Sequence, residues 1–87
     1  MINQLVRAAT SVGSNYCEAD CAESKKDFIH KISICKKEAK EVQHWFKMIV
    51  TAIPESRDKA QRLKAEAREL MLIFIVIVSS TKTKKDN

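Results

Sequence analysis

The feature that most constrains this chain is a line of apolar residues spaced alternately four and three positions apart. It occupies the middle of the sequence and consists of Phe28, Ile32, Cys35, Ala39, Val42, Phe46, Ile49 and Ile53. This spacing is the heptad repeat of helices whose side chains interlock with those of a neighbouring helix. It predicts a long helix over about residues 25–51 that packs against another helix along this line.

A second line on the same predicted helix is also partly apolar. It contains Ile34, Glu38, Glu41, Trp45 and Met48, again spaced four and three positions apart. At 100° per residue, this line lies about 100° or more around the helix from the first. Because large apolar side chains gain by leaving water, we expect this helix to have neighbours on two sides.

Two further helices are predicted, one on each side of the central one. The first covers about residues 2–22 and carries an apolar stripe. Gly13 lies inside it and suggests either a kink or the close approach of another backbone. Ser24 and Asp27 form a pattern typical of a helix N-cap, which places the start of the central helix at Lys25. The stripe of the first helix consists of Leu5, Ala8, Ala9, Val12, Tyr16 and Ala19.

The third predicted helix covers about residues 55–80 and follows Pro54, which disfavours helical backbone at Ile53. The run Leu70–Val78 within it is apolar on all sides. A β-strand here would have no partner, so a helix is favoured. The apolar line of this helix is Ala60, Leu63, Ala67, Leu70, Phe74, Ile77 and Thr81.

A helix that is apolar all round must be buried all round, which two companion helices cannot achieve. We therefore expect another subunit, or a segment absent from this chain, to cover the remaining apolar surface. The run of nine residues is too short for a bilayer, which needs about twenty, so no membrane partner is expected. The residues expected at this oligomer or missing-helix interface are Ile34, Trp45, Met48, Leu72, Ile73 and Val76.

The amino-acid composition further restricts the fold class. A chain of 87 residues with one Gly and one Pro cannot supply the turns of a β-sandwich or a Gly-rich phosphate loop. We expect one helical domain over residues 1–81 and a disordered basic tail over residues 82–87. The first residues lack the apolar core of a signal peptide, and the three cysteines are an odd number. Both observations predict a cytoplasmic protein with reduced thiols.

Polar residues form one stripe on the first helix, and they allow two interpretations. They could form a binding site, or they could form a structural network that fixes the register of two helices. The structural interpretation is favoured because buried polar groups must be paired and this set can pair with carboxylates of the central helix. The predicted network consists of Arg7, Ser11, Asn15, Glu18, Glu38 and Glu41.

Lysines crowd the central helix, and the net charge of the chain is +5. They are either an ordinary solvated helix face or a surface that contacts the phosphates of RNA or DNA. The solvated face is favoured, and the nucleic-acid surface is kept as the alternative. The candidate nucleic-acid contacts are Lys25, Lys26, Lys36, Lys37, Lys40 and Lys47.

Metal and catalytic sites have weaker support. Cys17, Cys21, Cys35 and His30 lack a C-x₂-C spacing, and Cys35 lies on the apolar line. The sequence Glu41-Val42-Gln43-His44 matches the Glu-x-x-His motif of di-metal bundles only once, whereas such sites need two copies. We therefore expect no metal, no cofactor, no catalytic residues and no small-molecule substrate.

Three segments together resemble a known family. They are the string R-A-A-x-S-V-x-x-N-x-x-E-A at residues 7–19, Ser24-Lys25-Lys26-Asp27-Phe28, and Lys37-Glu38-Ala39-x-Glu41. At these spacings the chain resembles the four-helix bundle proteins encoded within intervening sequences of bacterial 23S ribosomal RNA genes. The resemblance covers residues 4–45, about half of the chain.

The resemblance implies an antiparallel up-and-down bundle that assembles as a ring-like homopentamer and has no assigned enzymatic activity. A related branch, the accessory variability proteins of diversity-generating retroelements, is basic and works with a reverse transcriptase and nucleic acid. Family members usually carry another helix before the string, so we expect three helices of a four-helix bundle here, with the first family helix absent. The expected function is non-enzymatic and homo-oligomeric, and the alternative is a nucleic-acid-binding accessory protein.

Overall fold

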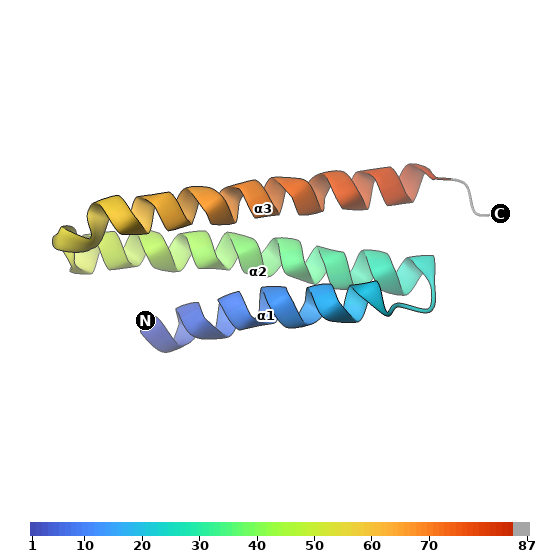
Figure 1. Ribbon diagram of the computed structural model, residues 1–87, viewed down its shortest axis with the longest axis horizontal. Helices are drawn as coiled ribbons and strands as arrows, with labels where there is room; N and C mark the ends of the chain where they lie inside the picture. The colour runs from blue at the N-terminus through green and yellow to red at the C-terminus, as the bar shows by residue number, and fades with distance from the viewer. Residues whose placement is uncertain (85–87) are drawn as a thin grey trace.

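Three antiparallel helices make up the fold, as Figure 1 shows for the computed structural model, which describes residues 1–84. They are α1 (Ile2–Asp20), α2 (Lys25–Ala52) and α3 (Arg57–Thr83), with a short 3₁₀ turn, η1 (Pro54–Ser56), before α3. The helix α2 lies between the other two, and the chain reverses direction at each connection (Figure 1). The all-α class and the up-and-down order are confirmed for the described residues.

The helix boundaries follow from local chemistry. The Ser24 hydroxyl accepts a hydrogen bond from the backbone N–H of Asp27 at 3.0 Å, so α2 begins at Lys25 as predicted. Pro54 stops α2, and its fixed φ angle suits the first residue of η1. The first helix ends at Asp20, two residues before the predicted end, because the N–H groups of Cys21 and Ala22 close a tight final turn.

The third helix is longer than predicted, since it ends at Thr83 rather than at residue 80. The prediction of a disordered tail is therefore wrong for Lys82 and Thr83. The Thr81 hydroxyl donates to the carbonyl of Ile77 at 2.7 Å, and the Thr83 hydroxyl donates to that of Ser79 at 3.2 Å. These bonds occupy carbonyl groups of the last turns. Residues 85–87 of the predicted tail lie outside the described residues.

The core follows the predicted line on α2. Ile32 and Cys35 are almost completely buried, and Phe28 and Phe46 are partly buried against the core. Ile53 departs from the prediction, because it caps the end of α2 and is 46% exposed. The other buried members of this line are Ala39, Val42 and Ile49.

The core line of α3 differs from the predicted one. Leu63 and Leu70 were expected in the core but are 41% and 45% exposed, whereas the predicted residue Phe74 is buried. The helix packs mainly against α2, and small side chains at the contact let the two backbones approach closely. The buried line is Ala60, Ala67, Phe74 and Val78, so the two leucines lie to one side of it.

The first and third helices are held apart, although both pack against α2. In the described part of the chain, the Cα atoms of α1 and α3 nowhere approach each other within 8 Å. Side chains still reach across: the ring centroids of Tyr16 on α1 and Phe74 on α3 are 6.5 Å apart. The three helices therefore leave one side of the core open.

The overall dimensions agree with this open arrangement. The radius of gyration is 14.7 Å. A compact domain of this length would have a value of about 12 Å. The accessible surface is 6287 Å². A compact monomer of this mass would expose about 5200 Å². The fold is therefore elongated and incompletely closed.

Candidate functional site

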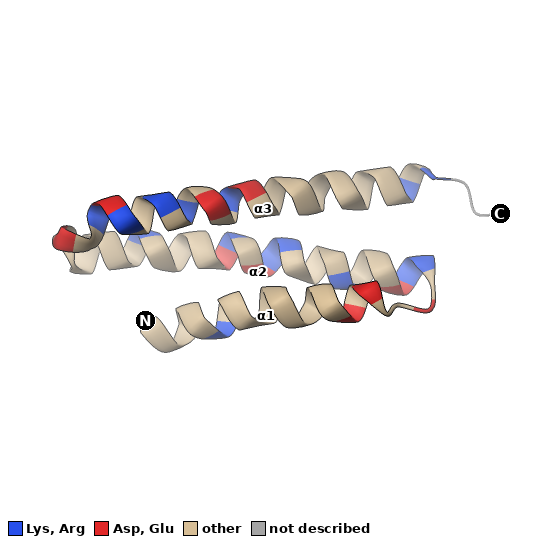
Figure 2. Ribbon diagram, in the orientation of Figure 1, with Lys and Arg blue, Asp and Glu red and all other residues tan. Residues whose placement is uncertain are grey.

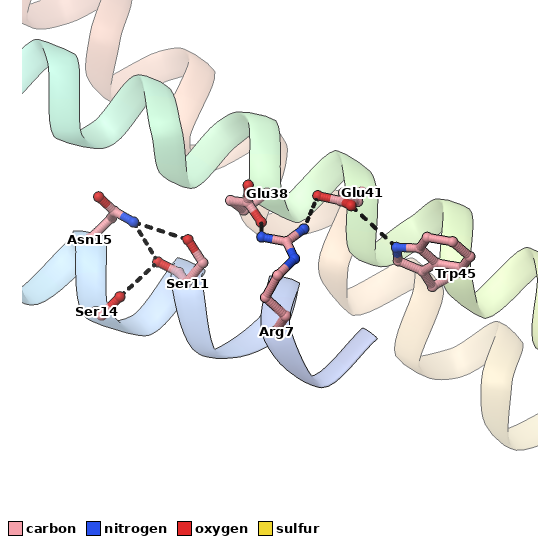
Figure 3. Close-up of polar contacts among 7 residues, drawn as sticks. All are labelled: Arg7, Ser11, Ser14, Asn15, Glu38, Glu41 and Trp45. Atoms are coloured by element: carbon pink, nitrogen blue, oxygen red, sulfur yellow. Dashed lines mark hydrogen bonds and ion pairs between the residues drawn. The ribbon is translucent and has the colours of Figure 1, made fainter. Parts of the chain in front are cut away.

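The clearest polar cluster joins α1 to α2 through one arginine and two glutamates (Figure 3). Arg7 on α1 donates from Nη1 to Oε2 of Glu38 at 3.1 Å and from Nη2 to Oε2 of Glu41. Because Glu38 and Glu41 are three residues apart on α2, both face the same side of the helix. The indole Nε1 of Trp45, one turn further along, donates to Oε1 of Glu41 at 3.3 Å.

The electrostatics of this cluster favour its charged form. Glu38 is only 7% exposed. Burying a carboxylate without a partner costs free energy, and the Arg7 guanidinium is the partner here. The hydrogen bond from Arg7, followed by that from Trp45, lowers the pKa of Glu41. The hydrogen bond to Glu41 raises the pKa of Arg7 in turn. A planar guanidinium held by two carboxylates fixes the register of α1 on α2.

The other members of the predicted network lie apart from this cluster. Asn15 donates from its side-chain amide to the carbonyl of Ser11 at 2.9 Å and to the Ser11 hydroxyl at 3.1 Å, both within α1. Glu18 instead accepts a bond from Lys31 of α2 at 3.1 Å. The structure therefore brings together Arg7, Glu38 and Glu41, whereas Ser11 and Asn15 bond to each other within α1 and Glu18 pairs with Lys31 of α2. The contribution of Trp45 was not anticipated from the sequence.

Two grooves follow the lysine-rich side of α2. One, of about 520 Å³, is lined by Arg7, Lys37, Glu38, Lys40, Glu41 and His44 and has mixed charge. The other, of about 320 Å³, is lined by Met71 and Ile75 of α3 and by Lys36, Lys37 and Lys40 of α2. The sequence identified these lysines but not the neighbouring residues of α3. The reason is that the residue pattern of one helix does not show which residues of another helix lie beside it.

The remaining candidate lysines are more scattered. Lys26 and Lys47 are exposed, whereas Lys25 is partly buried and donates from Nζ to the carbonyl of Lys84 at the far end of the chain. An exposed lysine can contact a phosphate directly. Lys25 is already engaged within the chain, which makes it the least available of the six.

The cysteines and histidines are dispersed. Cys17 and Cys21 are exposed on α1, whereas Cys35 is buried, and burial raises the pKa of its thiol. The His44 ring packs edge-on against Trp45, with 4.9 Å between ring centroids. Within residues 1–84, no three metal-binding side chains of His, Cys, Asp or Glu gather in one place.

The predicted apolar interface residues lie on two helices. On α2, Ile34 and Trp45 are half-buried and Met48 is 42% exposed. On α3, Leu72, Ile73 and Val76 line a shallow groove of about 290 Å³ together with Ile77. Figure 2 shows that charge gathers on the first half of α3 and that most of its second half is uncharged. Among the described helices, none has an apolar stretch long enough to span a bilayer.

The antiparallel helices and the arginine–glutamate cluster define a small all-α bundle protein. The chain belongs to the 23S rRNA-intervening sequence protein family, whose sequence model matches residues 1–75. It is also similar to a protein of unknown function from the S23 ribosomal protein family of Bacteroides thetaiotaomicron VPI-5482. That similarity has a TM-score of 0.83 and 32% identity, and it covers 87% of this chain and 70% of that chain. No curated protein matches the chain. The predicted family is thus confirmed.

Proposed function

We propose that this protein is a non-catalytic helical bundle that acts by assembling with copies of itself. The observation that supports this proposal is the bare apolar surface on the second half of α3. Leu72, Ile73 and Val76 are 43%, 52% and 62% exposed, and no charged residue occurs between Leu70 and Thr81. Continuous apolar surface of this kind marks an interaction site in a soluble protein.

The family membership supports the same proposal. The sequence resemblance implies a ring-like homopentamer, so the expected mass of the assembly is five times 9.9 kDa. In such a ring, each copy would contribute the outer side of α3, where Leu72 and Val76 lie. Burial of each side chain would add about 25 cal/mol per Å² of apolar surface removed from water.

The test compares two substitutions that each add one positive charge to exposed positions of α3. Leu72→Lys places a charge within the uncharged surface, whereas Gln61→Lys lies three turns earlier on nearly the same side of the helix. Light scattering should show that Leu72→Lys lowers the mass of the assembly and that Gln61→Lys leaves it unchanged. An unchanged mass for Leu72→Lys would remove the basis for this interface.

Nucleic-acid binding is a second candidate function, supported by the three lysines beside Met71 and Ile75. In an oligomer these lysines would repeat in every copy, and contact with phosphates would be salt-dependent and largely independent of sequence. A labelled RNA hairpin should bind at low salt and dissociate as salt increases. Replacement of Lys36, Lys37 and Lys40 with Gln should weaken binding at least tenfold.

The matched control removes the same charge from another part of the molecule. Replacement of Arg57, Lys59 and Arg62 with Gln also deletes three positive charges, at the start of α3. If the candidate lysines form the binding surface, the control should weaken binding less than the α2 variant does. Equal losses would mean that only net charge matters, and an absence of binding at low salt would reject this function.

A further inference from the structure

The groove between α2 and α3 combines positive charge with apolar surface. It is lined by Lys36, Lys37 and Lys40 of α2 and by Met71 and Ile75 of α3. Ile75 is 40% exposed, and Met71 is partly buried. Within residues 1–84, the three lysines form no ion pair with a carboxylate. The groove therefore places unpaired cations beside exposed apolar surface.

The positive charge continues along the same side of both helices. Lys47 lies seven residues after a lining lysine of α2, and Lys64 and Arg68 lie seven residues before the two apolar residues of α3. Seven residues make nearly two turns, so side chains at this spacing extend from the same side of a helix. Because α2 and α3 are antiparallel (Figure 1), both additions extend the groove in the same direction. We call the extended surface the basic groove; its cations are Lys36, Lys37, Lys40, Lys47, Lys64 and Arg68.

Acidic residues near this part of the two helices lie on other sides. Glu38 and Glu41 of α2 bond to Arg7 of α1. Glu66 and Glu69 of α3 lie about 120° or more around the helix from the apolar residues of the groove, at 100° per residue. A surface whose charges are of one sign attracts a ligand of the opposite sign, here a polyanion.

The apolar residues indicate which form of nucleic acid fits. A double helix has its phosphates outside and its base faces stacked inside, so it offers Met71 and Ile75 nothing apolar to contact. A single strand can turn a base outward and expose its flat face. The thioether of a methionine packs favourably against such a ring. An unpaired base would therefore cover both residues while the flanking phosphates contact the lysines.

We propose that the basic groove binds a single-stranded segment of nucleic acid, with one unpaired base packed against Met71 and Ile75. This inference rests on the nucleic-acid-binding function proposed above. It adds that the bound segment is unpaired and that α3 contributes to the contact. Every base has a flat face, so binding should depend little on sequence.

Three probes of equal length test this inference on the unaltered protein by fluorescence anisotropy. They are a labelled oligouridine of about twelve nucleotides, its duplex with oligoadenosine, and a strand whose nucleotides lack bases. The duplex carries twice as many phosphates, so charge alone would make it the tightest ligand. We expect oligouridine to bind more tightly than the duplex and roughly threefold or more tightly than the strand without bases.

A pair of substitutions tests the contribution of α3. Ile75→Thr keeps a branched side chain but adds a hydroxyl group, and it should weaken oligouridine binding roughly threefold or more without changing duplex binding. Ile2→Thr makes the same change at a 54% exposed position of α1 and should alter neither affinity. Circular dichroism checks that the helices are intact. If Ile75→Thr unfolds the chain, the three probes on the unaltered protein still decide the question.

The inference and the function on which it rests can fail separately. Equal or tighter binding of the duplex, equal binding of the strand without bases, or unchanged oligouridine binding by folded Ile75→Thr would each overturn the inference alone. If no probe binds at low salt, the nucleic-acid function is rejected together with it. Polyglutamate that displaces labelled oligouridine at a lower concentration than unlabelled oligouridine does would also overturn it, because the ligand would then be an acidic polypeptide.

Discussion

At the scale of single residues, the contact between α1 and α2 depends on one buried carboxylate. Glu38 is 7% exposed and has Arg7 as its charged partner, while Glu41 and Trp45 extend the same cluster outward. A buried charge without a partner costs more free energy than a pair of neutral groups in the same place. Loss of Arg7 should therefore destabilise the fold mainly because it would leave the Glu38 carboxylate buried without a cation.

Arg7→Met should lower the melting temperature by several degrees, because it leaves the Glu38 carboxylate buried without its cation. Arg7→Lys should have a smaller effect, since it keeps the positive charge and loses only the planar guanidinium that bonds to both carboxylates. Thermal unfolding followed by circular dichroism measures both. The double variant Arg7→Met/Glu38→Gln should recover part of the loss, and a double variant less stable than Arg7→Met would contradict this explanation.

The lowered pKa of Glu41 predicts a dependence of stability on pH. The usual glutamate value is about 4.5, and the hydrogen bond from Arg7 holds the folded value below it. Stability from this group is therefore complete above about pH 4.5 and is lost as the pH falls through the lower, folded value. Urea unfolding between pH 7 and pH 3 should show a weaker decline for Glu41→Gln than for the unaltered chain. Glu66→Gln, on α3, serves as the control and should retain the full decline.

At the scale of helices, the sequence predicts best where a helix has one unambiguous apolar side. The buried line of α2 is readable because charged residues occupy many of its other positions, and Ser24 marks its start. On α3 the second half is apolar on every side, so the heptad pattern fits more than one line. Leu70 was placed on the wrong line for this reason, because only the contact with α2 selects the true one, and Leu63 lies on that same line one heptad earlier.

The candidate site was predictable to a similar extent. Arg7, Glu38 and Glu41 meet because their charges and spacing suit a contact between neighbouring helices. Asn15 does not join them, because its side chain reaches the Ser11 carbonyl one turn earlier. A polar side chain can bond within its own helix or to another helix. Which bond it makes depends on its conformation, which a sequence pattern does not encode.

The N-cap of α2 gives a prediction at the scale of this helix. Ser24→Ala removes the acceptor for the Asp27 N–H and should reduce the free energy of unfolding by about 1 kcal/mol. Ser24→Asp keeps an acceptor at the same position and should restore most of that loss. Urea unfolding at neutral pH distinguishes the two variants. Equal stability of Ser24→Ala and the unaltered chain would show that the cap contributes nothing.

At the scale of the whole molecule, the separation of α1 from α3 is the dominant fact. Two helices pack on a third and leave apolar surface exposed both at the open side of the core and on the outer side of α3. Exposed apolar surface favours association in water. We therefore expect the folded chain to be an assembly, whose stability depends on its concentration.

Sedimentation equilibrium of the unaltered chain, measured over a wide range of concentrations, tests this claim most directly. We expect a mass that is a multiple of 9.9 kDa at micromolar concentration. On dilution the mass should decrease, and the helical circular dichroism signal should decrease with it. A folded, stable species of 9.9 kDa at every concentration would contradict it.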